Sequence, residues 1–214
     1  MGLAERRKRE QALQRKMRRK QIMDAAKTVF SSKAFSEATI EDIAREAELS
    51  PGALYIYFKN KDEIYASLNI AILRYLTKML EDLYRNSRLT SAQKIEAVKE
   101  ILYQVYKYDP TTMINVFHLQ SNERLKKLPK KFLSEINRLA AKSVRIIAKI
   151  FEDGVKEEVF IDSHPVAMAD VIWGVFSGLV LWEESKRIFD PDKNYLKSTL
   201  DLAFEILNSG IRRG

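Results

Sequence analysis

The sequence predicts an all-α protein of about nine helices. Its 214 residues contain only 7 Gly and 5 Pro, so few positions interrupt a helix. Apolar residues recur at spacings of three and four along most of the chain, and we find no convincing alternation of the kind that marks a strand. The expected breaks are short and lie at residues 109–110, 128–129, 154, 162–165 and 190–192. Short connections are typical of helices that pack side by side.

The first 20 residues form a basic arm. They carry nine Lys or Arg residues against Glu5 and Glu10, which leaves only about one net positive charge for the rest of this +8 chain. Such a concentration indicates a polyanionic partner, either nucleic acid or an anionic membrane surface. The alternative is a solvated tail without a partner. Leu13 and Met17 are four residues apart, so part of the arm could be helical.

Three helices are expected directly after the arm. The first ends near Lys33. The second begins at Thr39, because Thr39 and Asp42 have the spacing of a capping box. The third covers 51–58, with Ser50 as its N-cap and Pro51 at its first position. The apolar positions of the first two helices form one buried face each: Ile22, Ala26, Val29 and Phe30, then Ile40, Ile43, Ala44 and Ala47.

Six further helices are expected in the remainder of the chain. Asn60 caps a long helix that ends near Arg85, and Thr90 caps the next one, over 91–108. Asp109 and Pro110 begin a helix over 110–124. The last three cover 129–153, 165–187 and 193–211.

The helix at 165–187 is apolar on two sides, so two neighbours must cover it. A membrane span needs about 20 apolar residues, and Asp170 interrupts this run, so we favour a second copy of the chain over a membrane. A homodimer is therefore expected, in which the last two helices of each chain form a four-helix bundle. The expected interface consists of Met168, Ile172, Val175, Leu179 and Trp182, with Leu196, Leu200, Ala203 and Leu207 of the last helix.

Residues 39–61 have the plan of a helix-turn-helix DNA reader, with two short helices joined by a tight turn. Ala44 is small where the two helices cross, and Leu49, Leu54 and Phe58 supply the buried side. The exposed side of the second helix carries small residues, so its backbone can approach base edges in a major groove. The surface expected to face DNA is Ser50, Pro51, Gly52, Ala53 and Tyr57.

The stretch from Ile22 to Leu68 resembles the DNA-binding domain of the tetracycline-repressor (TetR) family. The residues that carry the resemblance are Thr39-Ile40-Glu41-Asp42-Ile43-Ala44, Leu49-Ser50-Pro51-Gly52-Ala53-Leu54-Tyr55, Tyr57-Phe58 and Asn60-Lys61. Two positions depart from the family pattern, because Ala34 and Glu48 stand where the family usually has Gly. A left-handed conformation at Glu48 would cost about 1 kcal/mol.

The resemblance implies a role for each residue of the reader. Thr39, Tyr55, Tyr57 and Lys61 are expected to contact phosphates, while Pro51, Gly52 and Ala53, together with Tyr57, are expected to lie at base edges. Two alternatives remain open here: Tyr55 could belong to the core, and Lys61 could be an ordinary surface residue.

The resemblance also implies a division of the chain and a small-molecule effector. Residues 1–20 would be the arm, 21–67 the DNA-binding domain, and 68–214 a ligand-binding and dimerisation domain. The candidate lining of an effector pocket is apolar, which favours a lipophilic effector. Gln120-Ser121-Asn122 and the helix pattern that follows resemble regulators that sense fatty acyl-coenzyme A. The candidate lining residues are Phe117, Ile136, Leu139, Phe151, Trp173 and Phe176.

The composition argues against an enzyme and against a metal or cofactor site. The chain has no Cys and two His, His118 and His164, and it has no glycine-rich phosphate loop. Together with these absences, the resemblance implies a cytoplasmic repressor that binds double-stranded operator DNA as a homodimer. The alternative is a protein that uses the basic arm to bind nucleic acid or an anionic membrane surface without sequence preference. An uncharacterised enzyme ranks third.

Overall fold

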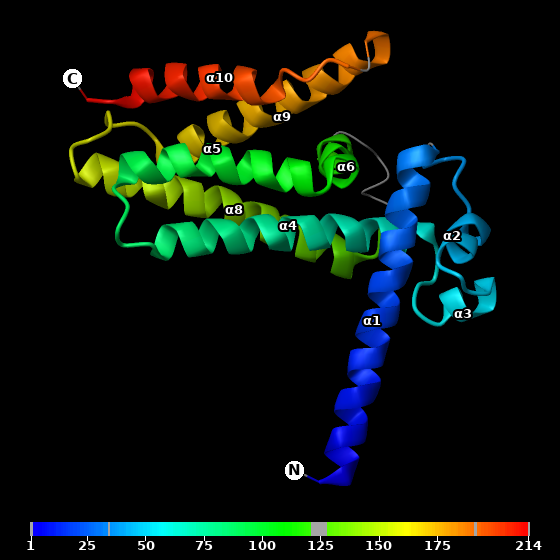
Figure 1. The fold of residues 1–214 in the computed structure, drawn as a ribbon. Coiled ribbons are helices and arrows are strands. Elements are labelled where there is room, and N and C mark those ends of the chain that lie inside the picture. Colours follow the sequence, from blue (N-terminus) through cyan, green and yellow to red (C-terminus); the bar gives the residue numbers. More distant parts are fainter. Residues whose placement is uncertain (1, 34, 121–127, 191, 214) are drawn as a thin grey trace.

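The computed structural model describes residues 2–33, 35–120, 128–190 and 192–213, and the described part is all-α (Figure 1). The helix bounds agree with the expected ones to within a few residues at most ends. The helices are α1 (Leu3–Ser32), α2 (Ile40–Glu46), α3 (Pro51–Tyr55), α4 (Lys61–Arg85), α5 (Ser91–Tyr108), α6 (Pro110–Gln120), α8 (Lys130–Lys156), α9 (Pro165–Phe189) and α10 (Leu196–Ile211).

The predicted caps explain where the helices begin. The Thr39 hydroxyl accepts a hydrogen bond from the Asp42 amide at 3.0 Å, and the Asp42 carboxylate accepts one from the Thr39 amide at 3.2 Å. Thr90 and Gln93 form the same reciprocal box at α5. Asn60 accepts from the Glu63 amide at 2.9 Å, and Asp109 accepts from the Thr112 amide at 3.0 Å. Each cap satisfies an amide that the helix itself leaves unpaired.

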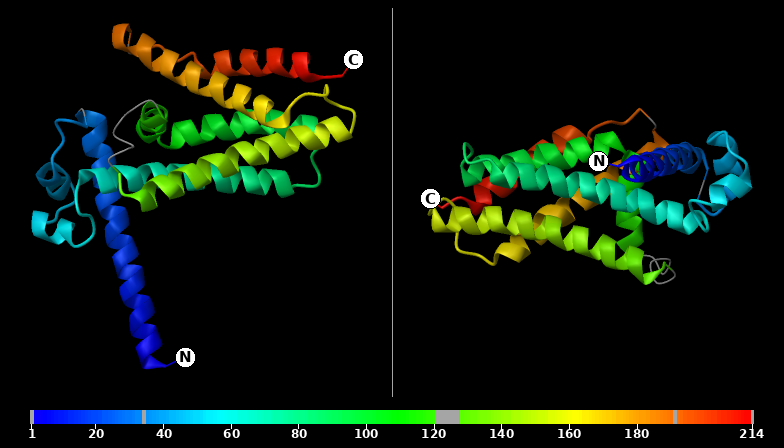
Figure 2. Two further views of the ribbon diagram at one scale, coloured as in Figure 1. Left: turned by 180° about the vertical axis from the view of Figure 1, so that it is seen from behind. Right: turned by 90° about the horizontal axis from the view of Figure 1, so that it is seen from below.

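The chain forms two hydrophobic cores that share α4. The smaller core joins α1, α2 and α3 to the first turns of α4 through Ile64 and Leu68. The larger core takes in the rest of α4 from Ala66 onward, with α5, α6, α8, α9 and α10. In the views of Figure 2, α4 runs from the small domain into the long bundle. This helix thus connects the two cores without interruption.

The sequence predicts that the helix over 129–153 ends at Gly154, and this prediction is wrong. The helix continues to Lys156, and a Cβ atom on Gly154 would lie 2.1 Å from the Phe160 ring. Phe160 stacks on Phe151 with ring centroids 5.2 Å apart. The glycine is therefore needed for close packing of a ring, and the helix ends two residues later.

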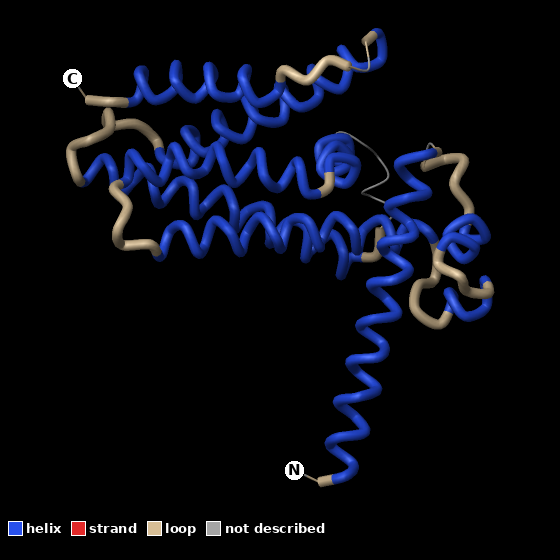
Figure 3. The backbone as a smooth tube through the Cα atoms, viewed as in Figure 1, coloured by secondary structure: helices blue, strands red, loops and turns tan. Residues whose placement is uncertain are grey.

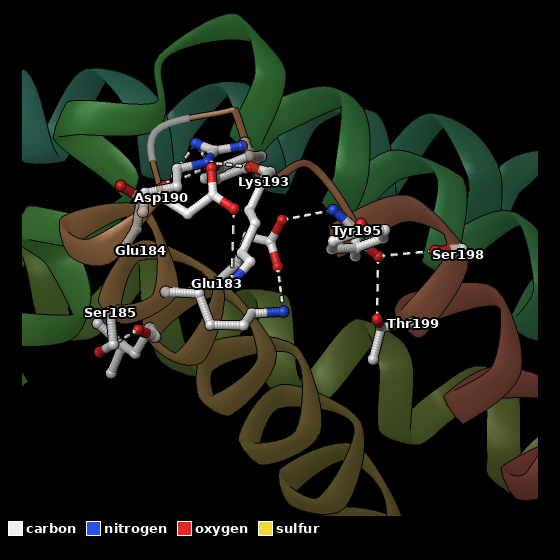
Figure 4. A network of polar contacts seen from close by, with 12 residues as sticks. Glu183, Glu184, Ser185, Asp190, Lys193, Tyr195, Ser198 and Thr199 are labelled. Carbon is white, nitrogen blue, oxygen red and sulfur yellow. Dashed lines mark hydrogen bonds and ion pairs between the residues drawn. The ribbon is translucent and has the colours of Figure 1, made fainter.

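A polar network fixes the turn between α9 and α10 (Figure 4). The buried Glu183 carboxylate accepts a hydrogen bond from the Tyr195 amide at 2.5 Å and pairs with Lys186 at 2.6 Å. Burial opposes ionisation, but these partners hold the pKa of Glu183 below its ordinary value. The Tyr195 carbonyl accepts from Ser198 and Thr199 at the start of α10. The network explains how the Glu183 carboxylate can be buried among the apolar residues of α9 that face the core.

The outer face of α9 is apolar and exposed in a single chain. Among the described helices, α9 is the one long and apolar enough to cross a membrane by length and composition, and 22% of its most apolar stretch is buried. The buried residues are Ala169, Ile172, Phe176, Val180 and Glu183. The face is therefore available to a partner in the single chain.

Candidate DNA-binding interface and effector region

The small domain lies at one end of the molecule, and Figure 3 shows α2 and α3 joined by a short turn beside α1. The turn closes through the Leu49 amide, which donates to the Ala44 carbonyl at 2.8 Å. Leu54 and Phe58 are buried and hold α3 against the small core. These contacts set the position and orientation of α3.

Glu48 adopts a left-handed conformation in this turn, with φ of 52°. The strain expected at this departure from the family pattern is therefore present in the fold. The other departure, Ala34, lies outside the described residues.

The face of α3 directed to solvent is small and close to the backbone. Pro51 and Gly52 are exposed, Ala53 is half-buried, and no atom lies within 4 Å of a Cβ placed on Gly52. The Ser50 hydroxyl accepts from the Ala53 amide at 3.2 Å and so organises the first turn. A flat surface of this kind can enter a major groove without a steric barrier.

Tyrosine and isoleucine side chains surround this small surface. Tyr55 is 51% exposed, so it is not a core residue, while Tyr57 is half-buried. Ile56 is 69% exposed and was not among the sequence candidates. An apolar pattern alone could not separate Ile56 from a core position, because its exposure depends on where α3 ends.

Thr39 lies exposed at the first turn of α2, where free amides and the helix dipole favour an anion. Its partner Asp42 also pairs with Lys33 at 3.1 Å. The hydrogen bonds from Lys33 and Thr39 hold the pKa of Asp42 below its ordinary value. Asp42 therefore stays ionised and keeps the cap in place.

Lys61 is half-buried and its ammonium contacts backbone carbonyls, so its expected phosphate contact stays a prediction beside a structural role. Its ammonium donates to the carbonyls of Phe35, Ser36 and Ala38 at 2.8, 3.2 and 2.8 Å. It also lies 4.8 Å from the centre of the Phe35 ring. An ammonium has three donors, and all of them are used to hold the segment before α2.

Arg19 is likewise part of the small domain and not a free charge of the arm. Its guanidinium donates to the Tyr57 carbonyl at 2.6 Å and lies 4.0 Å from the centre of the Phe58 ring. Burial is the main cause that lowers the pKa of Arg19, and repulsion from Arg15 lowers it further. The next residue but one, Gln21, donates to the Ala47 carbonyl at 2.7 Å. These contacts fix the end of α3 and the turn against α1.

The basic arm is helical and continuous with α1, and it projects away from the body (Figure 1). Every described residue before Arg19 is exposed. At about 1.5 Å per residue, the free part from Leu3 to Arg18 spans roughly 24 Å. The arm thus carries its cations beyond the body of the molecule.

The predicted effector lining is brought together only in part. Phe117, Trp173 and Phe176 form a cluster with ring centroids 5.6 to 6.2 Å apart. Trp173 also lines a cavity of about 240 Å³ between α4, α8 and α9. Ile136, Leu139 and Phe151 are buried in the same core. The Phe151 ring stacks on Phe160 and makes no ring contact with the cluster among the described aromatic pairs. Ser121 and Asn122 lie outside the described residues.

The predicted dimer residues divide between the core and the surface. Ile172, Leu196 and Leu200 are at most 2% exposed, so they cannot contact a partner, which corrects that part of the prediction. The helical spacing places Ile172 on the same stripe as Ala169 and Phe176. Trp182 is 63% exposed, and Met168, Val175, Leu179, Ala203 and Leu207 are half-buried. Further exposed apolar residues of α9 and α10 were missed: Val171, Phe189, Leu202 and Ile206.

Within the described residues, no group of three or more His, Asp or Glu could hold a metal ion. His164 serves as the N-cap of α9, where its Nδ1 accepts from the Ala167 amide at 3.4 Å.

Comparison with known proteins agrees with this arrangement. Residues 22–68 match the family model "Bacterial regulatory proteins, tetR family". The chain is 25% identical over 193 residues to a fatty acid metabolism regulator protein of Bacillus subtilis, an alignment that covers 89% of this chain and 94% of the relative. It is 29% identical over 199 residues to the HTH-type transcriptional repressor KstR2 of Rhodococcus jostii, with coverage of 86% and 90%.

Solved structures share the whole fold. PfmR of Thermus thermophilus, a TetR family transcriptional regulator, superposes with a TM-score of 0.74 at 18% identity, covering 90% of this chain and 99% of that one. FadR of Bacillus subtilis, in complex with stearoyl-CoA, gives 0.70 at 22% identity, with coverage of 90% and 98%. The TetR-family model thus covers the reader domain, and the aligned relatives and the shared fold show that the chain is similar to DNA-binding transcriptional regulators of this family along most of its length.

Proposed function

We propose that this protein is a homodimeric repressor that leaves its operator when a lipophilic effector, a fatty acyl-coenzyme A, binds to the helical domain. The observation that carries the DNA-binding part is the exposed first turn of α3, where small residues leave the backbone open to base edges. The division into arm, reader (21–67) and effector domain (68–214) is supported by the two cores that meet on α4.

In this proposal the reader residues act in two groups. Pro51, Gly52 and Ala53 lie at base edges, with Tyr57 beside them. Thr39, Ser50 and Tyr55 are exposed at the rim, where phosphates would lie. The hydroxyl groups of Ser50 and Tyr55 can donate to a phosphate, whereas that of Thr39 donates to Asp42 at 2.9 Å. Arg19 and Lys61 support this surface from behind through their carbonyl contacts.

A dimer is supported by the exposed apolar face of α9 and α10. Trp182, Phe189 and Ile206 are 63%, 89% and 63% exposed, a large exposure for apolar side chains on two neighbouring helices. A second copy would bury this face and bring two readers onto one operator, as closed two-fold symmetry requires.

The effector is supported by two independent observations. The cavity between α4, α8 and α9 is lined mainly by apolar residues, among them Leu73, Leu76 and Trp173. Relatives that align along most of this chain include a fatty acid metabolism regulator, and a structural neighbour binds stearoyl-CoA. Both point to an acyl chain held among the helices of the larger core in a cytoplasmic regulator.

The test is selection of bound duplexes from a random DNA pool, followed by release with palmitoyl-CoA. We expect one enriched palindromic site and its release at micromolar palmitoyl-CoA. Ala53→Glu should abolish site-specific binding without unfolding the protein, because a carboxylate would face base edges and phosphates. Glu37→Ala, an exposed change away from α3, serves as the control. Recovery of no preferred sequence would contradict the proposal.

A further inference from the structure

A groove of about 520 Å³ lies along α4 and α8 and is lined by basic residues. Its cations are Arg85 on α4 and Arg138, Lys142, Arg145 and Lys149 on α8, and Glu81 is the one acidic residue among the lining residues described. The groove lies near the end of α4 farthest from the reader, so it is separate from the DNA-binding surface (Figure 1).

Two of the five cations already have partners. Arg138 shares the carboxylate of Glu135 with Arg74, at 2.8 and 2.7 Å. Hydrogen bonds from these two guanidinium groups lower the pKa of Glu135 to about 2. Lys142 pairs with Glu81 across the two helices. These ion pairs hold the Arg138 and Lys142 side chains in place along the groove.

The other three cations lack such partners. Within the described part of the chain, no carboxylate lies within ion-pair distance of Arg85, Arg145 or Lys149. Arg138, Lys142, Arg145 and Lys149 also share one face of α8, because they are spaced by four, three and four residues. Like charges at this spacing destabilise a helix. A bound anion would remove that repulsion.

We propose that this groove binds the phosphate groups of a small-molecule ligand. One guanidinium group can donate two parallel hydrogen bonds to two oxygens of a phosphate. Arg85 and Arg145, which have no carboxylate partner among the described residues, can bind a phosphate in this way. The volume exceeds that of a single ion and suits a larger phosphorylated molecule. Tyr84 lies between Lys94 and Lys149, whose ammonium groups are 5.4 and 6.0 Å from its ring centre, and adds an aromatic surface.

The groove adjoins the apolar cavity of the proposed effector site. Ala141 lines both the groove and the cavity of about 240 Å³. One ligand could therefore place phosphates in the groove and an apolar chain between the helices. This deepens the proposed function, because a fatty acyl-coenzyme A has both parts. A ligand held by both α4 and α8 would also bias the position of α4, whose first turns belong to the reader.

The experiment measures binding of coenzyme A, palmitoyl-CoA and sodium palmitate to the full-length protein by calorimetry. It compares wild type with the double variant Arg145→Ala/Lys149→Ala. The control, Lys130→Ala/Arg213→Ala, removes the same charge at exposed positions outside the groove. We expect coenzyme A to bind wild type and the control alike, at one site per chain, and the groove variant at least tenfold more weakly. Palmitate binding should be unchanged in all three proteins.

The outcomes separate this inference from the proposed function. If palmitoyl-CoA releases operator DNA equally well from wild type and the groove variant, and both bind coenzyme A equally, the groove is not a phosphate site and the effector proposal stands. If coenzyme A binding is lost in the variant but palmitoyl-CoA does not release DNA, the groove stands and the effector is wrong. If the variant instead weakens binding of non-operator duplex DNA and coenzyme A does not bind, the groove is a nucleic-acid surface and the inference is overturned.

Discussion

Glu48 occupies a left-handed conformation (φ 52°) that strains a residue with a side chain. Its amide donates to the Arg45 carbonyl at 3.1 Å, and the following Leu49 amide closes the turn onto Ala44. The reader geometry thus overrides the local preference at one residue. The strain is local, so a residue without a Cβ atom would relieve it.

Glu48→Gly should stabilise the protein by about 0.5–1 kcal/mol, because relief of the strain exceeds the extra backbone entropy of glycine. Urea denaturation measures the change in free energy of unfolding. Glu46→Gly, at an exposed position at the end of α2, should destabilise by up to about 1 kcal/mol. Equal losses of stability in both variants would show that the turn is not strained.

A substitution of Lys61 tests whether this cation beside the reader stabilises the fold or contacts DNA. Lys61→Ala removes three hydrogen bonds to carbonyls, so we expect a loss of about 1–2 kcal/mol in stability. The dependence of DNA affinity on salt should remain that of the wild type. Lys59→Ala, an exposed neighbour, should keep full stability. A stable Lys61 variant whose salt slope falls by about one would instead identify a phosphate contact.

At the scale of elements, one ion pair joins α1 of the reader to α6 of the larger domain. Lys27 lies 2.8 Å from the Asp109 carboxylate, whose side chain is 7% exposed. Asp109 also caps α6 through the Thr112 amide. The same carboxylate therefore orders α6 and holds it to the reader, which places the pair on a direct route between the two domains.

Lys27→Met should destabilise the protein by about 1–3 kcal/mol, because it leaves the Asp109 carboxylate buried without its cation. Lys20→Met on the same helix removes an exposed pair with Asp24, whose side chains are 77% and 51% exposed, and should leave the stability nearly unchanged because solvent screens the pair. Thermal unfolding of both variants decides the matter. A Lys27 variant as stable as the Lys20 variant would mean that solvent replaces the lost cation.

The α9 face gives a second prediction for an element. Trp182→Arg should convert the dimer to monomers, because it places a charge within the exposed apolar surface. Leu179 is a less suitable site, since it packs partly against the core. Light scattering at micromolar concentration measures the mass, and Leu3→Arg, on the arm, is the control. A wild-type protein that is monomeric, or that sediments with lipid vesicles, contradicts the assignment of this face.

The sequence predicts features that depend on residues nearby in the chain. It does not predict features that depend on contacts between residues far apart in the chain. The caps at Thr39, Asn60 and Thr90 depend on residues three positions away, and the structure has them all. The contacts of the Lys61 ammonium with carbonyls more than 20 residues earlier could not be predicted in this way. Ile172 belongs to the core stripe because of how α9 is rotated against its neighbours, and periodicity alone leaves that rotation open by one position.

At the scale of the whole molecule, charge and shape are divided along the chain. Residues 1–20 hold most of the net positive charge, and the structure extends residues 3–18 as a helix beyond the body (Figure 1). Arg19 is fixed to the reader, so the cations before it are the ones free to contact DNA. A dimer would carry two such arms, one beside each reader, and would gain affinity from both.

Deletion of residues 2–16 tests this arrangement, because it removes six cations per chain and leaves Arg19 and the small core intact. Each neutralised phosphate contributes about 0.9 to the slope of log K against log salt. The truncated protein should keep its fold, dimer and preferred sequence but bind more weakly, most of all at low salt, with a smaller slope. Replacing Arg6, Arg7, Lys8 and Arg9 by Gln is the matched variant, since it keeps the helix and removes charge. An unchanged slope would show that the arm stays in solvent when DNA binds. A loss of sequence preference would show that the arm belongs to the reading surface. Equal binding of wild type to RNA or anionic vesicles would indicate a binder without sequence preference.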